Sequence, residues 1–199
     1  MSKIYFIDNQ DSFTYNLVEE LNALELNVEV YRNTLSAEFI TQRIENSIAN
    51  HEQPILFLSP GPGTPSDSPT MMALIAKFCG VIPIIGICLG HQALAEHYGA
   101  TVDLAGETVH GKSSVIDLKD HEIFNDFGNA LQVARYHSLV ARDLPSELKQ
   151  IAMFGDLVMA MVHEQDKTLG FQFHPESILT TNGSHLLKNS IAYLTQNSN

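Results

Sequence analysis

The sequence predicts an α/β protein with a doubly wound, mostly parallel β-sheet that is covered by helices on both faces. Short apolar segments alternate strictly with helix-like segments through the first half of the chain. Residues 55–58 form a continuous apolar run, typical of a strand buried on both faces. The 199 residues, 44% of them hydrophobic, are enough for one well-buried core. We therefore expect a single domain over residues 1–199.

The N-terminal segments predict a β-α-β opening. A strand is expected at 4–7, a helix after Asp11 and a second strand at 28–31. Ser36 has the hydroxyl that commonly caps a helix, so a second helix is expected to begin there. It leads to the buried strand at 55–58.

The next segments continue the alternation. Residues 67–69, Asp-Ser-Pro, combine a cap with a proline at the first helical position and predict a helix to about Cys79. The largely apolar run 81–87 predicts the next buried strand. A helix then begins at Cys88 and ends near Gly99, because glycine commonly terminates helices.

The C-terminal half predicts an additional antiparallel β portion. The Gly155-Asp156 pair predicts a hairpin turn, and an amphipathic helix over 184–195 is expected to dock on the sheet. The short β-like runs lie at 115–116, 131–133, 151–153, 158–162 and 170–173.

Composition excludes several classes of protein. The chain carries 11 Lys and Arg against 23 Asp and Glu, and its net charge of −12 disfavours a nucleic-acid partner. Its two cysteines have no metal or disulfide spacing. The N-terminus does not resemble a signal peptide, and no apolar stretch approaches the roughly 20 residues that span a bilayer. We expect a cytoplasmic protein.

Cys88 is the strongest chemical signal. It lies in Gly86-Ile87-Cys88-Leu89-Gly90, where a predicted strand gives way to a helix, which is the pattern of a nucleophile elbow. Such a tight turn needs small residues two positions before and after the nucleophile. The N-terminus of the helix would favour a thiolate. The alternative, a buried structural cysteine, explains the two glycines less well.

His174 and Glu176 form a second signal at the end of the predicted strand 170–173. Residues two apart on a strand lie on one side, so the carboxylate could orient the imidazole as the base of a thiol nucleophile. Alone, the pair could equally be a surface ion pair. Together with the elbow it indicates a cysteine-histidine-glutamate triad.

The third signal is the stiff loop Ser59-Pro-Gly-Pro-Gly-Thr-Pro65, directly after a buried strand. It lacks the lysine of a phosphate-binding loop. Amides at Gly61 and Gly63 can approach a substrate closely, and one of them could share an oxyanion hole with the Leu89 amide. A plain rigid turn is about equally consistent with this segment alone.

These motifs, with Arg135-Tyr-His-Ser-Leu139, occur in the order found in class I glutamine amidotransferases, and the chain resembles that family along its whole length. Residues 8–14, 110–112 and 177–179 are similar to the glutaminase subunits of anthranilate and aminodeoxychorismate synthases. Residues 31–33 and 178–181 favour the anthranilate branch. The resemblance implies a flavodoxin-like arrangement of the sheet.

The resemblance also implies a mechanism. Cys88 attacks the side-chain amide of glutamine, His174 protonates the departing ammonia, and Glu176 orients the ring. The amides of Gly61 and Leu89 form the oxyanion hole. No cofactor is implied for this chain, with Mg²⁺ expected only in a partner synthase subunit. The implied substrate-binding residues are Gly61, Pro62, Gly63, Gln92, Ser138 and Leu139.

The resemblance implies a hetero-oligomer. The released ammonia would pass to a separate chorismate-binding synthase subunit that makes anthranilate for tryptophan biosynthesis. A glutaminase subunit of an aminodeoxychorismate synthase, in folate biosynthesis, is the first alternative. Two alternatives are weaker. A free-standing cysteine hydrolase of the same fold could use the same elbow, but the Gly61 loop and residues 135–139 argue against it. A catalytically silent regulatory subunit is disfavoured because Cys88, His174 and Glu176 are all present.

Overall fold

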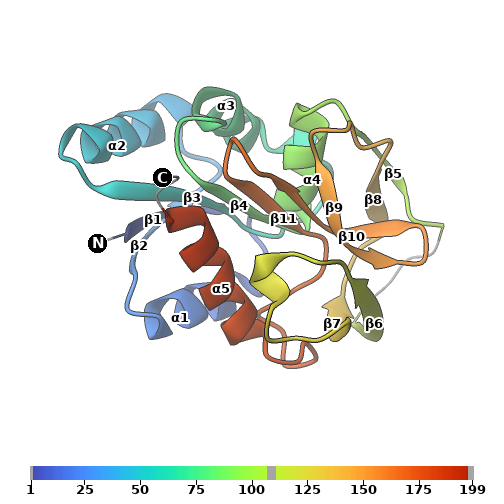
Figure 1. Ribbon diagram of the computed structural model, residues 1–199. Coiled ribbons are helices and arrows are strands. Elements are labelled where there is room, and N and C mark those ends of the chain that lie inside the picture. Colours follow the sequence, from blue (N-terminus) through green and yellow to red (C-terminus); the bar gives the residue numbers. More distant parts are fainter. Residues whose placement is uncertain (1, 107–110, 197–199) are drawn as a thin grey trace.

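A computed structural model describes residues 2–106 and 111–196 (Figure 1). The helices are α1 (Thr14–Ala23), α2 (Ala37–Ala49), α3 (Pro69–Phe78), α4 (Leu89–His97) and α5 (Gly183–Thr195). The strands are β1 (Ser2–Asp8), β2 (Asn27–Arg32), β3 (Gln53–Leu58), β4 (Ile84–Ile87), β5 (Thr101–Leu104), β6 (Lys112–Leu118), β7 (Ala130–Arg135), β8 (Leu139–Arg142), β9 (Lys149–Phe154), β10 (Leu157–His163) and β11 (Thr168–Phe171). Short 3-10 turns occur at Pro65–Asp67 and Glu122–Phe124.

Nine strands form one sheet in the order β2-β1-β3-β4-β11-β10-β9-β6-β7. The strands from β2 to β11 are parallel, and every pairing from β11 to β7 is antiparallel. The predicted α/β fold and its antiparallel C-terminal portion are confirmed. β11 joins the two portions, because it pairs in parallel with β4 and antiparallel with β10.

Helices cover both faces of the sheet (Figure 1). Alternate residues of β1 point to opposite faces: Ile4 and Phe6 pack in the cluster that includes residues of α1 and α5, and Tyr5 and Ile7 in the cluster under α2, α3 and α4. This two-residue alternation in a fully buried strand produces the continuous apolar run seen in the sequence.

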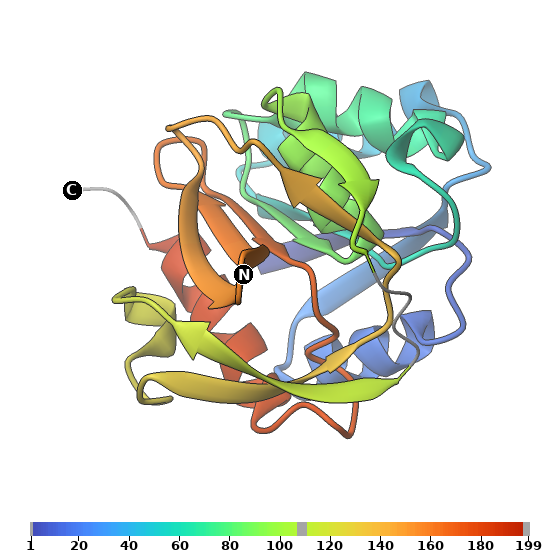
Figure 2. The ribbon, with the colours of Figure 1, turned by 90° about the vertical axis from the view of Figure 1, so that its right-hand side faces the viewer.

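A second, two-stranded sheet pairs β5 with β8 and packs against α4 (Figure 2). The sequence did not predict it. β5 is short and three of its four side chains are exposed, so it carries no apolar alternation. The small sheet matters because Leu139, an expected substrate-binding residue, is the first residue of β8.

Most observed strands extend beyond the predicted runs, whereas β4 begins later and β11 ends earlier than predicted. β4 begins at Ile84, because the amides of Val81 and Ile82 still donate to the carbonyl of Phe78 at the end of α3. β11 ends at Phe171, two residues before the predicted end of that strand.

Among the described helices, none is long and apolar enough to cross a membrane.

Candidate active site

Cys88 lies between β4 and α4 in a strained backbone conformation, with φ of 50° and ψ of −97°. A positive φ is uncommon for a residue with a side chain and persists only where the surroundings enforce it. Here the Cys88 amide donates to the carbonyl of Phe171 on β11 at 2.7 Å, and its carbonyl accepts from the amide of Gln92 at 3.0 Å. The turn is therefore fixed from both sides.

The two glycines of the elbow are required by close contacts. A Cβ on Gly86 would lie 2.4 Å from the carbonyl carbon of Gly90, and one on Gly90 would lie 2.6 Å from the carbonyl oxygen of Leu58. Any side chain would push α4 away from the end of β4. The spacing in the sequence thus reflects how closely α4 packs on the ends of β3 and β4.

His174 and Glu176 are in direct contact: Nδ1 of His174 lies 2.7 Å from Oε1 of Glu176, and both side chains are buried. The expected alternation along a strand is wrong, because Glu176 lies in a turn after the strand has ended. The backbone of His174 is instead held by its amide, which donates to Ala134, and by its carbonyl, which accepts from the hydroxyl of Thr180.

The charge of His174 is set by three influences. Burial favours the neutral ring, but the Cys88 sulfur and the Glu176 carboxylate outweigh it and raise the pKa of His174 well above its ordinary value. Within residues 2–106 and 111–196, Nε2 of His174 has no partner that satisfies normal hydrogen-bond geometry. That nitrogen is thus left for proton transfer beside the sulfur.

The loop after β3 packs tightly against the first βα turn. A Cβ on Gly61 would lie 2.6 Å from Cβ of Asn9 and 2.9 Å from Cδ2 of Leu89. Asn9 is buried, its backbone N–H donates to Oγ of Ser59 at 2.8 Å, and its side-chain Nδ2 donates to the carbonyl of Ser59 at 3.0 Å. In the sequence, Asn9 belongs to residues 8–14, which were noted only for their resemblance to known glutaminase subunits. The structure shows that Asn9 anchors this loop.

A cavity of about 160 Å³ opens at Cys88. All six expected substrate-binding residues line it, although their roles remain predictions. Leu89, His174 and Glu176 are not among its lining residues; Leu89 packs its side chain on Gly61. The lining residues are Gly61, Pro62, Gly63, Cys88, Gln92, Tyr136, His137, Ser138 and Leu139.

Sequence reasoning missed Gln172 and Tyr136. The ring of Tyr136 packs edge-on against His174 with centroids 5.0 Å apart. Nε2 of Gln172 lies 3.6 Å from Sγ of Cys88, and Gln172 is fully buried. One signal could have found it: Gln172 is a polar residue between two phenylalanines in a predicted buried strand, and such a residue needs hydrogen-bond partners.

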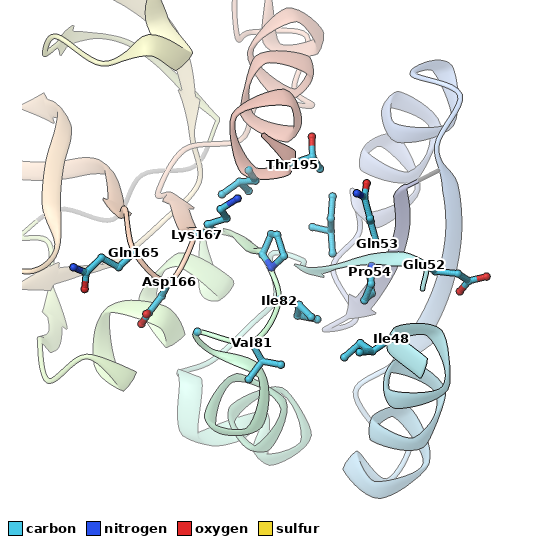
Figure 3. Close-up of a pocket in the computed structure, with 14 residues that line it drawn as sticks. Ile48, Glu52, Gln53, Pro54, Val81, Ile82, Gln165, Asp166, Lys167 and Thr195 are labelled. Atoms are coloured by element: carbon cyan, nitrogen blue, oxygen red, sulfur yellow. The ribbon is translucent and has the colours of Figure 1, made fainter. Parts of the chain in front are cut away.

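A larger cavity, of about 430 Å³, lies at the opposite end of the parallel strands. Figure 3 shows it between Ile48 near the end of α2, Gln53 at the start of β3, Val81 before β4, Lys167 before β11 and Thr195 at the end of α5. None of the expected site residues lines this cavity. A second cavity of about 430 Å³ is lined by Glu176 and Tyr136, so volume alone does not locate the site.

Metal binding has no support in the part of the chain that the structure describes, where no group of three or more His, Cys, Asp and Glu side chains could hold a metal ion. Of the segments that carried the resemblance, His110 in residues 110–112 lies outside the described residues. The chemistry on view is that of a thiol, an imidazole and a carboxylate.

Comparison with known proteins gives consistent results. The family model described as "Glutamine amidotransferase class-I" matches residues 5–193. "Anthranilate synthase component 2" of Vibrio parahaemolyticus is 51% identical over 100% of both chains, and the protein of that name from Helicobacter pylori is 46% identical over 96% of this chain and 97% of its own.

Solved structures share the fold. A putative GMP synthase component from Thermoplasma acidophilum superimposes with a TM-score of 0.82 at 24% identity, over 98% of this chain and 94% of that one. A glutamine amidotransferase from Thermotoga maritima superimposes with a TM-score of 0.69 at 19% identity, over 96% and 81%. At these identities the likeness concerns the fold.

Proposed function

The chain belongs to the class I glutamine amidotransferase family, and from this we propose that Cys88, His174 and Glu176 hydrolyse glutamine to glutamate and ammonia. The Cys88 thiolate attacks the side-chain amide carbon, and His174 gives its proton to the departing ammonia. A γ-glutamyl thioester remains. Water, which loses its proton to His174, then releases glutamate, while Glu176 keeps the ring oriented. This sequence of steps needs no cofactor of its own.

The observation that carries the proposal is the 2.7 Å pair of His174 and Glu176 beside a cysteine at φ of 50°. A structural cysteine needs neither a strained backbone nor a protonated imidazole as a neighbour. The cavity at Cys88, about 160 Å³, suits a small amino acid. Within it we assign Gly61, Pro62, Gly63, Gln92, Ser138 and Leu139 to substrate binding. The amides of Gly61 and Leu89 would stabilise the oxyanion.

Covalent labelling tests this assignment. An electrophilic glutamine analogue should modify Cys88, and excess glutamine should protect it. Cys79, the other cysteine, is a control within the same molecule, because it is half-buried and lies away from the cavity. Labelling that glutamine does not slow would instead favour a free-standing cysteine hydrolase. Absence of ammonia release from glutamine, with or without a synthase subunit, would favour a silent regulatory subunit.

We further propose that the ammonia serves a separate chorismate-binding synthase subunit that makes anthranilate in tryptophan biosynthesis. The relatives named above, which match this chain over nearly its whole length, are called component 2 of anthranilate synthase. A second component is implied by that name. Any Mg²⁺ requirement would belong to the partner.

The surface next to the triad supports docking of another protein. Ile178, two residues after Glu176, is wholly exposed, and it lines a cavity with Phe13 and Tyr136. Exposed apolar side chains gathered beside a site are typical of interfaces. Product analysis with the copurified partner separates the candidates: anthranilate supports the proposal, and aminodeoxychorismate would assign the chain to the folate branch.

A further inference from the structure

Gln172 is a buried polar side chain for which the proposed mechanism has no role. It directly follows β11, and its backbone amide donates to the carbonyl of Met159 on β10. Its carboxamide lies between two residues of the site: Nε2 is 3.6 Å from Sγ of Cys88, and Oε1 is 3.1 Å from Nε2 of Gln92. A carboxamide this deeply buried is stable only when its polar atoms are paired.

The direction of these hydrogen bonds follows from one backbone group. The carbonyl oxygen of Leu139 can only accept, so the Gln92 atom 2.9 Å from it is the amide nitrogen. The same nitrogen faces Gln172, whose facing atom must then be its carbonyl oxygen. The nitrogen of Gln172 is therefore the atom that faces the sulfur of Cys88.

The Leu139 carbonyl is itself held by a second pair of side chains. Nε of Arg135 donates to Nε2 of His137 at 3.1 Å, so His137 carries its proton on Nδ1. That nitrogen lies 3.1 Å from the Leu139 oxygen and donates to it. Burial and the charge of Arg135 lower the pKa of His137 to about 4, so the ring is neutral near pH 7 and this direction is kept.

We propose that Gln172 is a catalytic residue that donates a hydrogen bond to the Cys88 thiolate and holds the amide of Gln92 in one orientation. The inference rests on the proposed function, since it assigns a further part of the same site. A hydrogen bond to an anionic sulfur favours the thiolate over the thiol. The bond weakens when the sulfur becomes a neutral thioester and forms again when hydrolysis releases the thiolate.

The same carboxamide connects the nucleophile to the cavity. Both N–H groups of Gln92 are used, one by Leu139 and one by Gln172. Only the amide oxygen of Gln92 is then left for a ligand in the cavity that Gln92 lines. Loss of the Gln172 carbonyl would release Gln92 to rotate, and loss of its N–H would affect only Cys88. The two roles can be separated by choice of substitution.

The test is the pH dependence of Cys88 alkylation by iodoacetamide in a Cys79→Ser background. Gln172→Glu keeps an acceptor for Gln92 but sets a carboxylate against the sulfur, so the pH of half-maximal alkylation should rise by roughly 1 to 2 units. Gln172→Met, of similar shape and without a donor, should raise it by roughly 0.5 to 1 unit. Gln150→Glu, the same change on β9, should leave it unmoved.

Glutaminase kinetics give a second readout. We expect Gln172→Glu to lower kcat about tenfold with little change in KM, and Gln172→Met to raise KM as well, because Gln92 loses its partner. Thermal melting shows whether each variant is folded, and if Gln172→Glu is not, Gln172→Met alone decides. An unmoved alkylation midpoint in a folded variant overturns the inference. The alkylation test needs no glutamine, so failure of the proposed function is recognised separately, as absence of ammonia release by the unaltered protein.

Discussion

The two ends of the parallel strands each hold a cysteine beside titratable side chains, and only one arrangement is suited to catalysis. At the carboxyl end, Cys88 has φ of 50° and lies next to an imidazole whose pKa is raised. At the amino end, Cys79 has an ordinary φ of −59°, and its sulfur lies 2.7 Å from the hydroxyl of Tyr98.

The hydroxyl of Tyr98, beside Cys79, keeps its proton and is not suited to act as a base. Tyr98 donates to Asp166 at 2.8 Å, and burial together with Cys79 and Asp166 raises the pKa of Tyr98 far above its ordinary value. Near pH 7 this hydroxyl is protonated. A cysteine within a polar cluster is thus not a nucleophile by proximity alone; backbone strain and a chargeable base make the difference.

The largest expected effect separates the two cysteines directly. Cys88→Ala should lower glutamine hydrolysis by at least about 10³-fold, because the thiolate that attacks the amide carbon is lost. Cys79→Ala should stay within about twofold of the unaltered protein, since its contacts are structural. Ammonia release with saturating glutamine measures both. Equal losses in the two folded variants would remove the distinction between the two ends.

The two carboxylates give the next largest contrast. Glu176→Gln should lower kcat by roughly 10²- to 10⁴-fold, because the charge that orients His174 and raises its pKa is lost. The alkaline limb of the pH profile of kcat should also move to lower pH, because without the carboxylate the His174 imidazolium loses its proton at a lower pH. Asp166→Asn, the matched change beside Tyr98, should leave both kcat and the profile unchanged. A profile that does not move in Glu176→Gln would contradict the assigned role of Glu176.

Gly86, within β4, and Gly80, before β4, test how closely the chain is packed near each end of this strand. Gly86→Ala should destabilise the fold by about 3 kcal/mol or more, because its Cβ would lie 2.4 Å from backbone of Gly90. Gly80→Ala should cost only about 1 to 2 kcal/mol, from its φ of 75°, since the nearest atom is the end of the Asp166 side chain at 3.3 Å. Urea unfolding measures the difference. Similar costs would show that α4 can shift to make room.

The smallest expected effect concerns stability at low pH. Burial lowers the pKa of His91, in α4 behind the elbow, to about 3 from an ordinary 6.5. The unfolded chain therefore binds a proton below about pH 6.5 that the folded chain does not, and stability falls as the pH falls. Between pH 7 and 5 the loss from His91 should be about 2 kcal/mol. His91→Gln should remove that part of the pH dependence in urea titrations, whatever its cost at pH 7.

Local chemistry in the sequence predicted most of the fold and the centre of the site. The apolar run of β3 and the glycines around Cys88 each act within a few residues, so they are visible in the sequence. The β5–β8 sheet and the role of Gln172 were not, because they depend on residues brought together by folding. Gln172 and Cys88 are 84 positions apart. The pairing of His174 with Glu176 was predicted for the wrong reason, since a turn and not strand alternation brings them together.

The position of β11 in the chain also affects the order in which the enzyme is completed. The Cys88 amide donates to the carbonyl of Phe171, and His174 follows Phe171 only three residues later. The cysteine precedes both in the chain, so until β11 is in place Cys88 has neither this backbone restraint nor its base. Insertion of one late strand between β4 and β10 then supplies the backbone restraint and the imidazole together. The restraint on the nucleophile and the base that serves it therefore come from one short segment of the chain.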